Sequence, residues 1–222
     1  MKQFSCVLFD LDGTLSASSE GITRSLFLAL EAFGLHESSQ AVLESFIGPP
    51  LNVRLKEVYH VSNGEALTII AAFRARYETI GYRECRLYPG VKQMLETFVG
   101  EGITLAVASS KPESFVLKIL SFFSLTSLFS VICGSSMDDE AKGTATGNQK
   151  SGIIKRALSL LSAQDCSALM VGDRFYDING AMDNHIASAG VTWGYGTREE
   201  LSKATFIADT PDESISYIVG KK

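Results

Sequence analysis

The sequence has few of the residues that build disulfide frameworks or soft-metal sites. Its 222 residues include four cysteines and three histidines, and no two cysteines form a C-x-x-C pair. The histidines lie far apart, without the spacing of metal ligands, which argues against a histidine-based metal site. We therefore expect free thiols in a reducing cytoplasm. The cysteines are Cys6, Cys85, Cys133 and Cys166, and the histidines are His36, His60 and His185.

Long apolar runs and basic clusters are also missing from the sequence. No stretch approaches the roughly 20 apolar residues that span a bilayer, and the N-terminal apolar run is too short for a secretory signal because it ends at Asp10. The net charge of -5 and the scattered Lys and Arg residues offer no footprint for a nucleic acid polymer. We expect a cytoplasmic globular protein that binds neither membrane nor nucleic acid.

Short β-branched runs alternate with segments of helical spacing, such as 91–98 and 153–161. This alternation predicts an α/β fold with a parallel sheet that is covered on both faces. The predicted strands are 6–9, 103–108, 129–133, 168–171, 188–193 and, more weakly, 205–207.

The stretch 16–85 interrupts the alternation. One amphipathic helix runs from Ile22 to Phe33, and a second, from Ile69 to Ile80, is predicted to end at Gly81. A shorter helical piece and the loop 47–51 lie between them. We therefore predict a small helical domain, 16–85, inserted into a core domain made of 1–15 and 86–222.

Two aspartates, Asp10 and Asp12, follow the first predicted strand and precede Gly13. In extended backbone, side chains two residues apart point to the same side, so both carboxylates can face one site. A polar strand end before a turn is the simpler alternative. Two anions held this close usually need a cation or a shared proton.

Other strands end in polar residues too, and ligands of open parallel sheets bind beyond such ends. Structural explanations exist for each: Ser110 with Glu113 fits a helix capping box, Asp173 could cap a helix, and Asp177 could favour its first turn. Taken together, however, they supply the oxygen ligands that Mg²⁺ prefers and the donors that a phosphate needs. The set is Asp10, Asp12, Ser109, Ser110, Lys150, Asp173 and Asp177.

This arrangement resembles the haloacid dehalogenase superfamily of phosphohydrolases. Four motifs appear in order along essentially the whole chain, beginning with Asp10-Leu11-Asp12-Gly13-Thr14-Leu15, followed by Ser109, Lys150, and Gly172-Asp173 with Asp177. The resemblance implies a Rossmann-like core, and it makes the insertion 16–85 a cap of the first type.

The resemblance also implies roles. Asp10 would be the nucleophile that becomes a phosphoaspartate, and Asp12 the general acid and then base. The phosphoryl group would be bound by Ser109, Ser110 and Lys150. Mg²⁺ would be held by the carboxylates of Asp10 and Asp173 and the backbone carbonyl of Asp12, with Asp177 in direct or outer-shell support.

Further residues resemble the phosphoglycolate-phosphatase-like and bacterial 5′-nucleotidase-like members. They are 20–22, 46–51, 88–90, 109–112, 134–138, 172–174 and 194–196, while Ala17 departs from the pattern where relatives often carry Asp. We expect a small phosphorylated metabolite as substrate, such as a nucleoside 5′-monophosphate. Alternatives are phosphoglycolate hydrolysis, a β-phosphoglucomutase-like mutase and, remotely, a phosphoaspartate signalling module. A dehalogenase would have no use for Asp12.

The cap is expected to choose the substrate. Gly48 and Pro49 belong to a stiff turn that would lie over the site or simply turn the chain. Arg54, just beyond it, could reach a second anionic group on the substrate or remain a solvated surface residue. Trp193 and Tyr195 are expected to pack against the core, and the alternative is that they line the pocket.

Overall fold

A computed structural model describes residues 3–136, 149–161 and 167–220 of the chain. Three residues that entered the sequence analysis, Met137, Asp138 and Cys166, lie outside the described ranges. Cys85 and Cys133 are free thiols, as predicted. Within the described ranges, no helix has both the length and the apolar character needed to cross a membrane.

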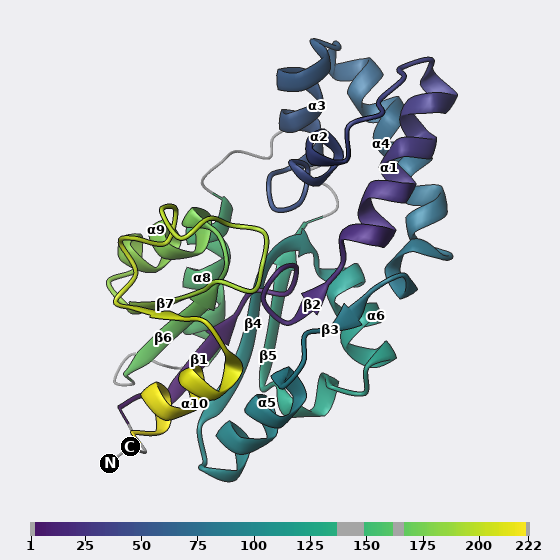
Figure 1. Ribbon diagram of the computed structural model, residues 1–222. Helices are drawn as coiled ribbons and strands as arrows, with labels where there is room; N and C mark the ends of the chain where they lie inside the picture. The colour runs from purple at the N-terminus through teal and green to yellow at the C-terminus, as the bar shows by residue number, and fades with distance from the viewer. Residues whose placement is uncertain (1–2, 137–148, 162–166, 221–222) are drawn as a thin grey trace.

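A six-stranded sheet lies at the centre of the core (Figure 1). Its order is β5-β4-β1-β6-β7-β8, and every neighbouring pair is parallel. The predicted α/β fold is therefore confirmed, and the strand order reverses between β1 and β6, where such sheets bind ligands. The strands are β1 (Cys6–Phe9), β4 (Thr104–Pro112), β5 (Val131–Ser135), β6 (Ala168–Gly172), β7 (Ala187–Val191) and β8 (Phe206–Ala208).

Helices cover both faces of this sheet, because successive side chains of a strand point to opposite sides. In β1, Val7 and Phe9 join the apolar cluster under one helical layer, whereas Cys6 and Leu8 join the cluster under the other. Burial on both faces explains why the strand reads as a continuous apolar run. The first layer holds α5 (Val91–Gly100), α6 (Glu113–Phe122) and α10 (Pro211–Val219), and the second holds α8 (Gln149–Leu160) and α9 (Phe175–Asp183).

The segment between β1 and α5 forms a separate group of helices beyond the carboxyl end of the sheet (Figure 1). Its ends are joined by a small antiparallel pair, in which Ser16 lies opposite Leu87 and Ala17 opposite Arg86. The elements are β2 (Ser16–Ala17), α1 (Ser19–Phe33), α2 (Gln40–Glu44), α3 (Leu51–Tyr59), α4 (Asn63–Tyr77), the short 3₁₀ turn Gly81–Arg83 and β3 (Arg86–Leu87). We call the segment Ser19–Tyr77 the cap.

Two local predictions were wrong. The second cap helix ends at Tyr77 rather than Gly81, and Ile80 is 54% exposed instead of extending the apolar stripe. Ser110 does not cap a helix, because β4 continues to Pro112 and α6 begins at Glu113 without a side-chain cap. The carboxylate of Glu113 instead accepts a hydrogen bond from the backbone N–H of Gly134.

Candidate active site

The carboxyl end of β1 delivers the first two aspartates. The backbone N–H of Asp10 donates to the carbonyl of Val171 at 2.9 Å, which ties this residue to the end of β6. Gly13 follows with φ +86°, and a methyl group at this position would collide with the carboxylate of Asp173. Glycine therefore lets the two strand ends approach closely.

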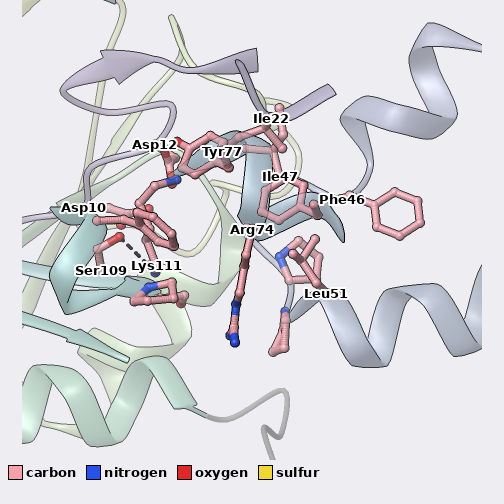
Figure 2. A pocket seen from close by; sticks show the side chains of 17 residues that line it. Asp10, Asp12, Ile22, Phe46, Ile47, Leu51, Arg74, Tyr77, Ser109 and Lys111 are labelled. Carbon is pink, nitrogen blue, oxygen red and sulfur yellow. Dashed lines mark hydrogen bonds and ion pairs between the residues drawn. The ribbon is translucent and has the colours of Figure 1, made fainter. Parts of the chain in front are cut away.

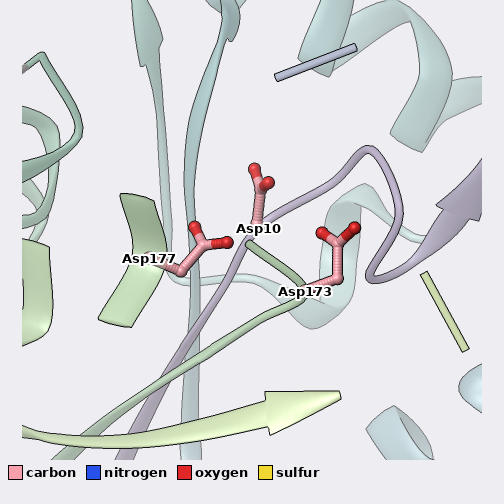
Figure 3. Close-up of side chains that lie close together, drawn as sticks. All are labelled: Asp10, Asp173 and Asp177. Atoms are coloured by element: carbon pink, nitrogen blue, oxygen red, sulfur yellow. The ribbon is translucent and has the colours of Figure 1, made fainter. Parts of the chain in front are cut away.

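Three carboxylates meet at this point of the sheet. Asp10, Asp173 and Asp177 each offer an oxygen, and these oxygens lie within 4.8 Å of one another (Figure 3). All three residues are buried, at 8%, 0% and 1% exposure. A cluster of hard oxygen donors at this spacing suits a cation such as Mg²⁺.

Burial and mutual repulsion oppose the charge of this cluster. Loss of hydration, followed by the charges of Asp177 and Asp10, raises the pKa of Asp173 well above its ordinary value. Burial likewise raises the pKa of Asp177 to about 6, although Lys150 acts in the opposite direction. A bound cation would relieve both effects, so the donor set fits such an ion.

Lys150 provides the cation on one side of the cluster. Its Nζ lies 2.8 Å from Oδ1 of Asp10 and 2.8 Å from Oδ1 of Asp177. Burial alone would lower the pKa of Lys150, but the two carboxylates outweigh it and raise the pKa. Lys150 is the second residue of α8, which begins at Gln149.

The carboxylate of Asp12 has a different partner, which the sequence analysis missed. Lys111 Nζ lies 2.8 Å from Oδ2 of Asp12, and the same ammonium lies 4.8 Å from the ring centroid of Tyr77 in the cap. The other oxygen, Oδ1 of Asp12, is buried without a hydrogen-bond partner among the described residues. The Asp12 side chain is not part of the three-carboxylate cluster, so only its backbone carbonyl remains for the predicted metal contact.

Asp173 is held by its neighbours rather than capping a helix. Its Oδ1 accepts from the hydroxyl of Thr14 at 3.2 Å, and its Oδ2 accepts from the backbone N–H of Tyr195 at 2.7 Å. The Tyr195 hydroxyl accepts from the backbone N–H groups of Ser18 and Ser19. Trp193 donates to the carbonyl of Thr14 and packs against the core. The loop after β7 therefore positions the acidic cluster.

A cavity opens between this acidic edge and the cap. Asp10, Asp12, Ser109, Ser110 and Lys111 line its core side (Figure 2). Ser109 is buried, and its Oγ accepts the backbone N–H of Lys111 at 3.3 Å. The candidate phosphate-binding hydroxyls thus face the same space as the two aspartates.

The cap side of the cavity is mainly apolar. Gly48 and Pro49 line it, whereas Arg54 does not. Arg54 instead donates to the hydroxyl of Ser45 and pairs with Glu57. The arginine that lines the cavity is Arg74 from α4, which the sequence did not single out because it lies on an ordinary helical face.

The family model described as haloacid dehalogenase-like hydrolase matches residues 7–191. The matched range contains every residue placed at the acidic edge, from Asp10 to Asp177, and most of the chain.

Similar proteins carry related names. A 5′-nucleotidase from Pseudomonas aeruginosa is 41% identical over 197 residues, covering 88% of this chain and 86% of that protein. A tyrosine-protein kinase from Mycobacterium tuberculosis is 33% identical over 199 residues, covering 90% and 66%. A phosphoglycolate phosphatase from Aliivibrio fischeri is 31% identical over 221 residues, covering 96% and 94%. The crystal structure of a predicted phosphatase from Clostridium acetobutylicum has a TM-score of 0.88 at 36% identity, covering 98% and 99%. The chain therefore belongs to the haloacid dehalogenase-like hydrolase family and is one of its phosphatases.

Proposed function

We propose that this phosphatase is a Mg²⁺-dependent phosphomonoesterase that works through a phosphoaspartate on Asp10, with nucleoside 5′-monophosphates as its substrate class. The observation that carries the proposal is the place of Asp10. Its carboxylate belongs to the buried acidic cluster and also lines the cavity, together with Ser109. A carboxylate nucleophile needs positive charge close to it and a pocket that holds the phosphoryl group next to its attacking oxygen.

In the first step, an oxygen of Asp10 attacks phosphorus and forms the P–O bond of the acyl phosphate. The bond to the leaving oxygen breaks, and the protonated carboxyl of Asp12 gives that oxygen its proton. Lys150 holds Asp10 at 2.8 Å and keeps positive charge next to the reacting phosphoryl group. Ser109 donates its hydroxyl hydrogen to a phosphoryl oxygen.

In the second step, Asp12 is a carboxylate and accepts a proton from water. The water oxygen attacks phosphorus, the P–O bond to Asp10 breaks, and inorganic phosphate leaves. The unpartnered Oδ1 of Asp12 suits this exchange, because Lys111 occupies only Oδ2.

Mg²⁺ would be held by the carboxylates of Asp10, Asp173 and Asp177, which are the described residues gathered for such an ion. When bound, it supplies positive charge that screens the phosphoryl oxygens from the attacking carboxylate.

The cap side of the cavity indicates the leaving group. Ile47, Leu51 and Phe73 are among the apolar residues that line it there. Arg74 adds one guanidinium (Figure 2). A flat base fits such walls, since guanidinium groups stack on rings and donate to ring acceptors. Phosphoglycolate would leave the apolar surface unused, and a sugar phosphate would place several hydroxyls against it. A response-regulator-like signalling module would need no such cavity.

We expect phosphate release from nucleoside 5′-monophosphates in Mg²⁺, and its loss in EDTA. The panel compares these nucleotides with phosphoglycolate, a sugar phosphate and an aryl phosphate, and free phosphate is measured. Mg²⁺ should also raise the melting temperature of the protein, because a cation that binds only the folded state stabilises it by mass action. Release only from phosphoglycolate would overturn the substrate class, and equal release in EDTA would overturn the metal requirement.

Arg74→Met is expected to raise KM for a nucleoside monophosphate about tenfold, because one charge-assisted contact is worth about 1.4 kcal/mol. Steady-state kinetics on the nucleotide and on acetyl phosphate, whose leaving group is small, make the measurement. Arg54→Met is the matched variant on the neighbouring helix. A larger rise in KM for the nucleotide in Arg54→Met than in Arg74→Met would assign the contact with the leaving group to Arg54.

A further inference from the structure

Arg174 joins the acidic edge of the core to the cap. It directly follows Asp173, and its backbone N–H donates to Oδ2 of Asp177 at 3.1 Å. Its side chain leaves in another direction: Nη1 donates to the carbonyl of Ile47 at 3.1 Å, and Nε pairs with Glu200 at 2.9 Å. One residue therefore touches the metal-binding cluster through its backbone and the cap through its guanidinium.

The segment that Arg174 contacts is a wall of the cavity. Residues 46–51 line the cap side, and Gly48, which follows Ile47, adopts φ +106°. A methyl group on Gly48 would lie 3.7 Å from Nη1, so the loop and the guanidinium are in direct contact distance. Residues 47–50 form neither a strand nor a helix. The hydrogen bond from Arg174 therefore connects an irregular loop to the core.

We propose that Arg174 is a positioning residue that holds the 46–51 loop over the site and thereby selects substrates with a leaving group large enough to contact that loop. The selection rests on the proposed phosphatase function, whereas the holding of the loop does not. Arg174 does not touch the reacting atoms in this assignment. Its guanidinium sets where Phe46 and Leu51 lie relative to Ser109.

The side chain suits this task. It is 18% exposed and its partner Glu200 is 28% exposed, so the pair is screened from water more than a surface ion pair. The planar guanidinium can donate to a carboxylate and a carbonyl in two directions at once, whereas a lysine ammonium is a single point of charge on a flexible stem. The carboxylate of Glu200 accepts a hydrogen bond from Nε, and the carbonyl of Ile47 accepts one from Nη1.

Hydrogen–deuterium exchange of the free protein tests the holding of the loop. We expect Arg174→Met to speed exchange in peptides that cover 46–51 about tenfold, Arg174→Lys to fall between it and wild type, and Glu200→Gln to speed exchange about threefold. Local opening becomes easier when such a contact is removed. The matched control is Arg156→Met, because Arg156 also bridges a glutamate and a carbonyl, Glu113 and Gly134, but within the core. It should leave exchange at 46–51 as in wild type.

Kinetics test the selection. In Arg174→Met, the ratio of kcat/KM for a nucleoside monophosphate to kcat/KM for acetyl phosphate should fall about tenfold, mainly through KM for the nucleotide. Arg174→Lys should recover part of the ratio. Unchanged exchange at 46–51 in a folded Arg174→Met or Glu200→Gln protein would overturn the proposal, and so would equal losses on both substrates. Phosphate release from no substrate would refute the proposed function instead, and the exchange result would still decide the role of Arg174.

Discussion

Replacing Asp10 with asparagine is expected to lower kcat for phosphate release by about 10⁴-fold or more, the scale of removing a covalent nucleophile. Asparagine keeps the size of the side chain but has no carboxylate oxygen to form an acyl phosphate. Lys150 retains its ion pair with Asp177 in this variant, so the fold should persist. Steady-state release from a nucleoside monophosphate gives the rate.

Two further measurements make the result specific to Asp10. Acid-quenched wild-type protein should retain label from a substrate labelled in its phosphoryl group, and Asp10→Asn should retain none. Asp183→Asn is the matched control, because this aspartate is exposed on α9, and it should keep the wild-type rate. An Asp10→Asn protein with a tenth or more of the wild-type rate would exclude the phosphoaspartate.

The acidic edge could be predicted from the sequence because its residues depend on strand ends. Asp10 and Asp173 each follow a short apolar run, and parallel strands end at the same edge of a sheet. The α/β pattern and the order of the strands are therefore enough to predict that these two carboxylates lie close together. Asp177 follows for the same reason, since it lies in the first turn of the next helix.

The contacts between core and cap could not be predicted in this way. Lys111 meets the ring of Tyr77 only after α4 has packed above the end of β4. Arg74 and Arg174 depend on the same placement, which no local spacing encodes. Arg54 had the favourable position in the sequence, next to the Gly-Pro turn, but Ser45 and Glu57 on the cap take up its donors.

Replacing Lys150 with methionine is expected to destabilise the metal-free protein by about 3–5 kcal/mol, as when one partner of a buried ion pair is removed. Methionine fills a similar volume but leaves Asp10 and Asp177 as buried carboxylates without their cation. For a protein of this length, the melting temperature should fall by about 10 °C. Phosphate release should fall at least about 100-fold, since a cation beside the phosphoryl group is lost. Lys155→Met, exposed on the same helix, is the control and should change neither quantity.

The pH dependence of this variant identifies charge, rather than packing, as the cause. Burial already holds the pKa of Asp177 at about 6, above its ordinary value, and without Lys150 it should rise further. A carboxyl whose pKa is higher in the folded state than in the unfolded state binds more protons when the protein is folded. Its unfavourable effect on the free energy of unfolding therefore grows as pH rises from about 4 through the folded pKa. Lys150→Met should therefore regain stability relative to wild type as pH falls from 7 to 5. If the stability of Lys150→Met stays below that of wild type by the same amount over this pH range, the loss is due to packing.

Asp177→Asn in the Lys150→Met background separates stability from catalysis. The double variant removes one buried carboxylate along with the ammonium, so the remaining cluster carries less uncompensated charge and the melting temperature should recover by several degrees. Turnover should not recover, because the phosphoryl group still lacks the ammonium of Lys150 beside Asp10. Mg²⁺ should raise the melting temperature of Lys150→Met more than that of wild type, since the single variant leaves the cluster more negative. Recovery of both stability and turnover in the double variant would mean that Lys150 only balances charge in the fold.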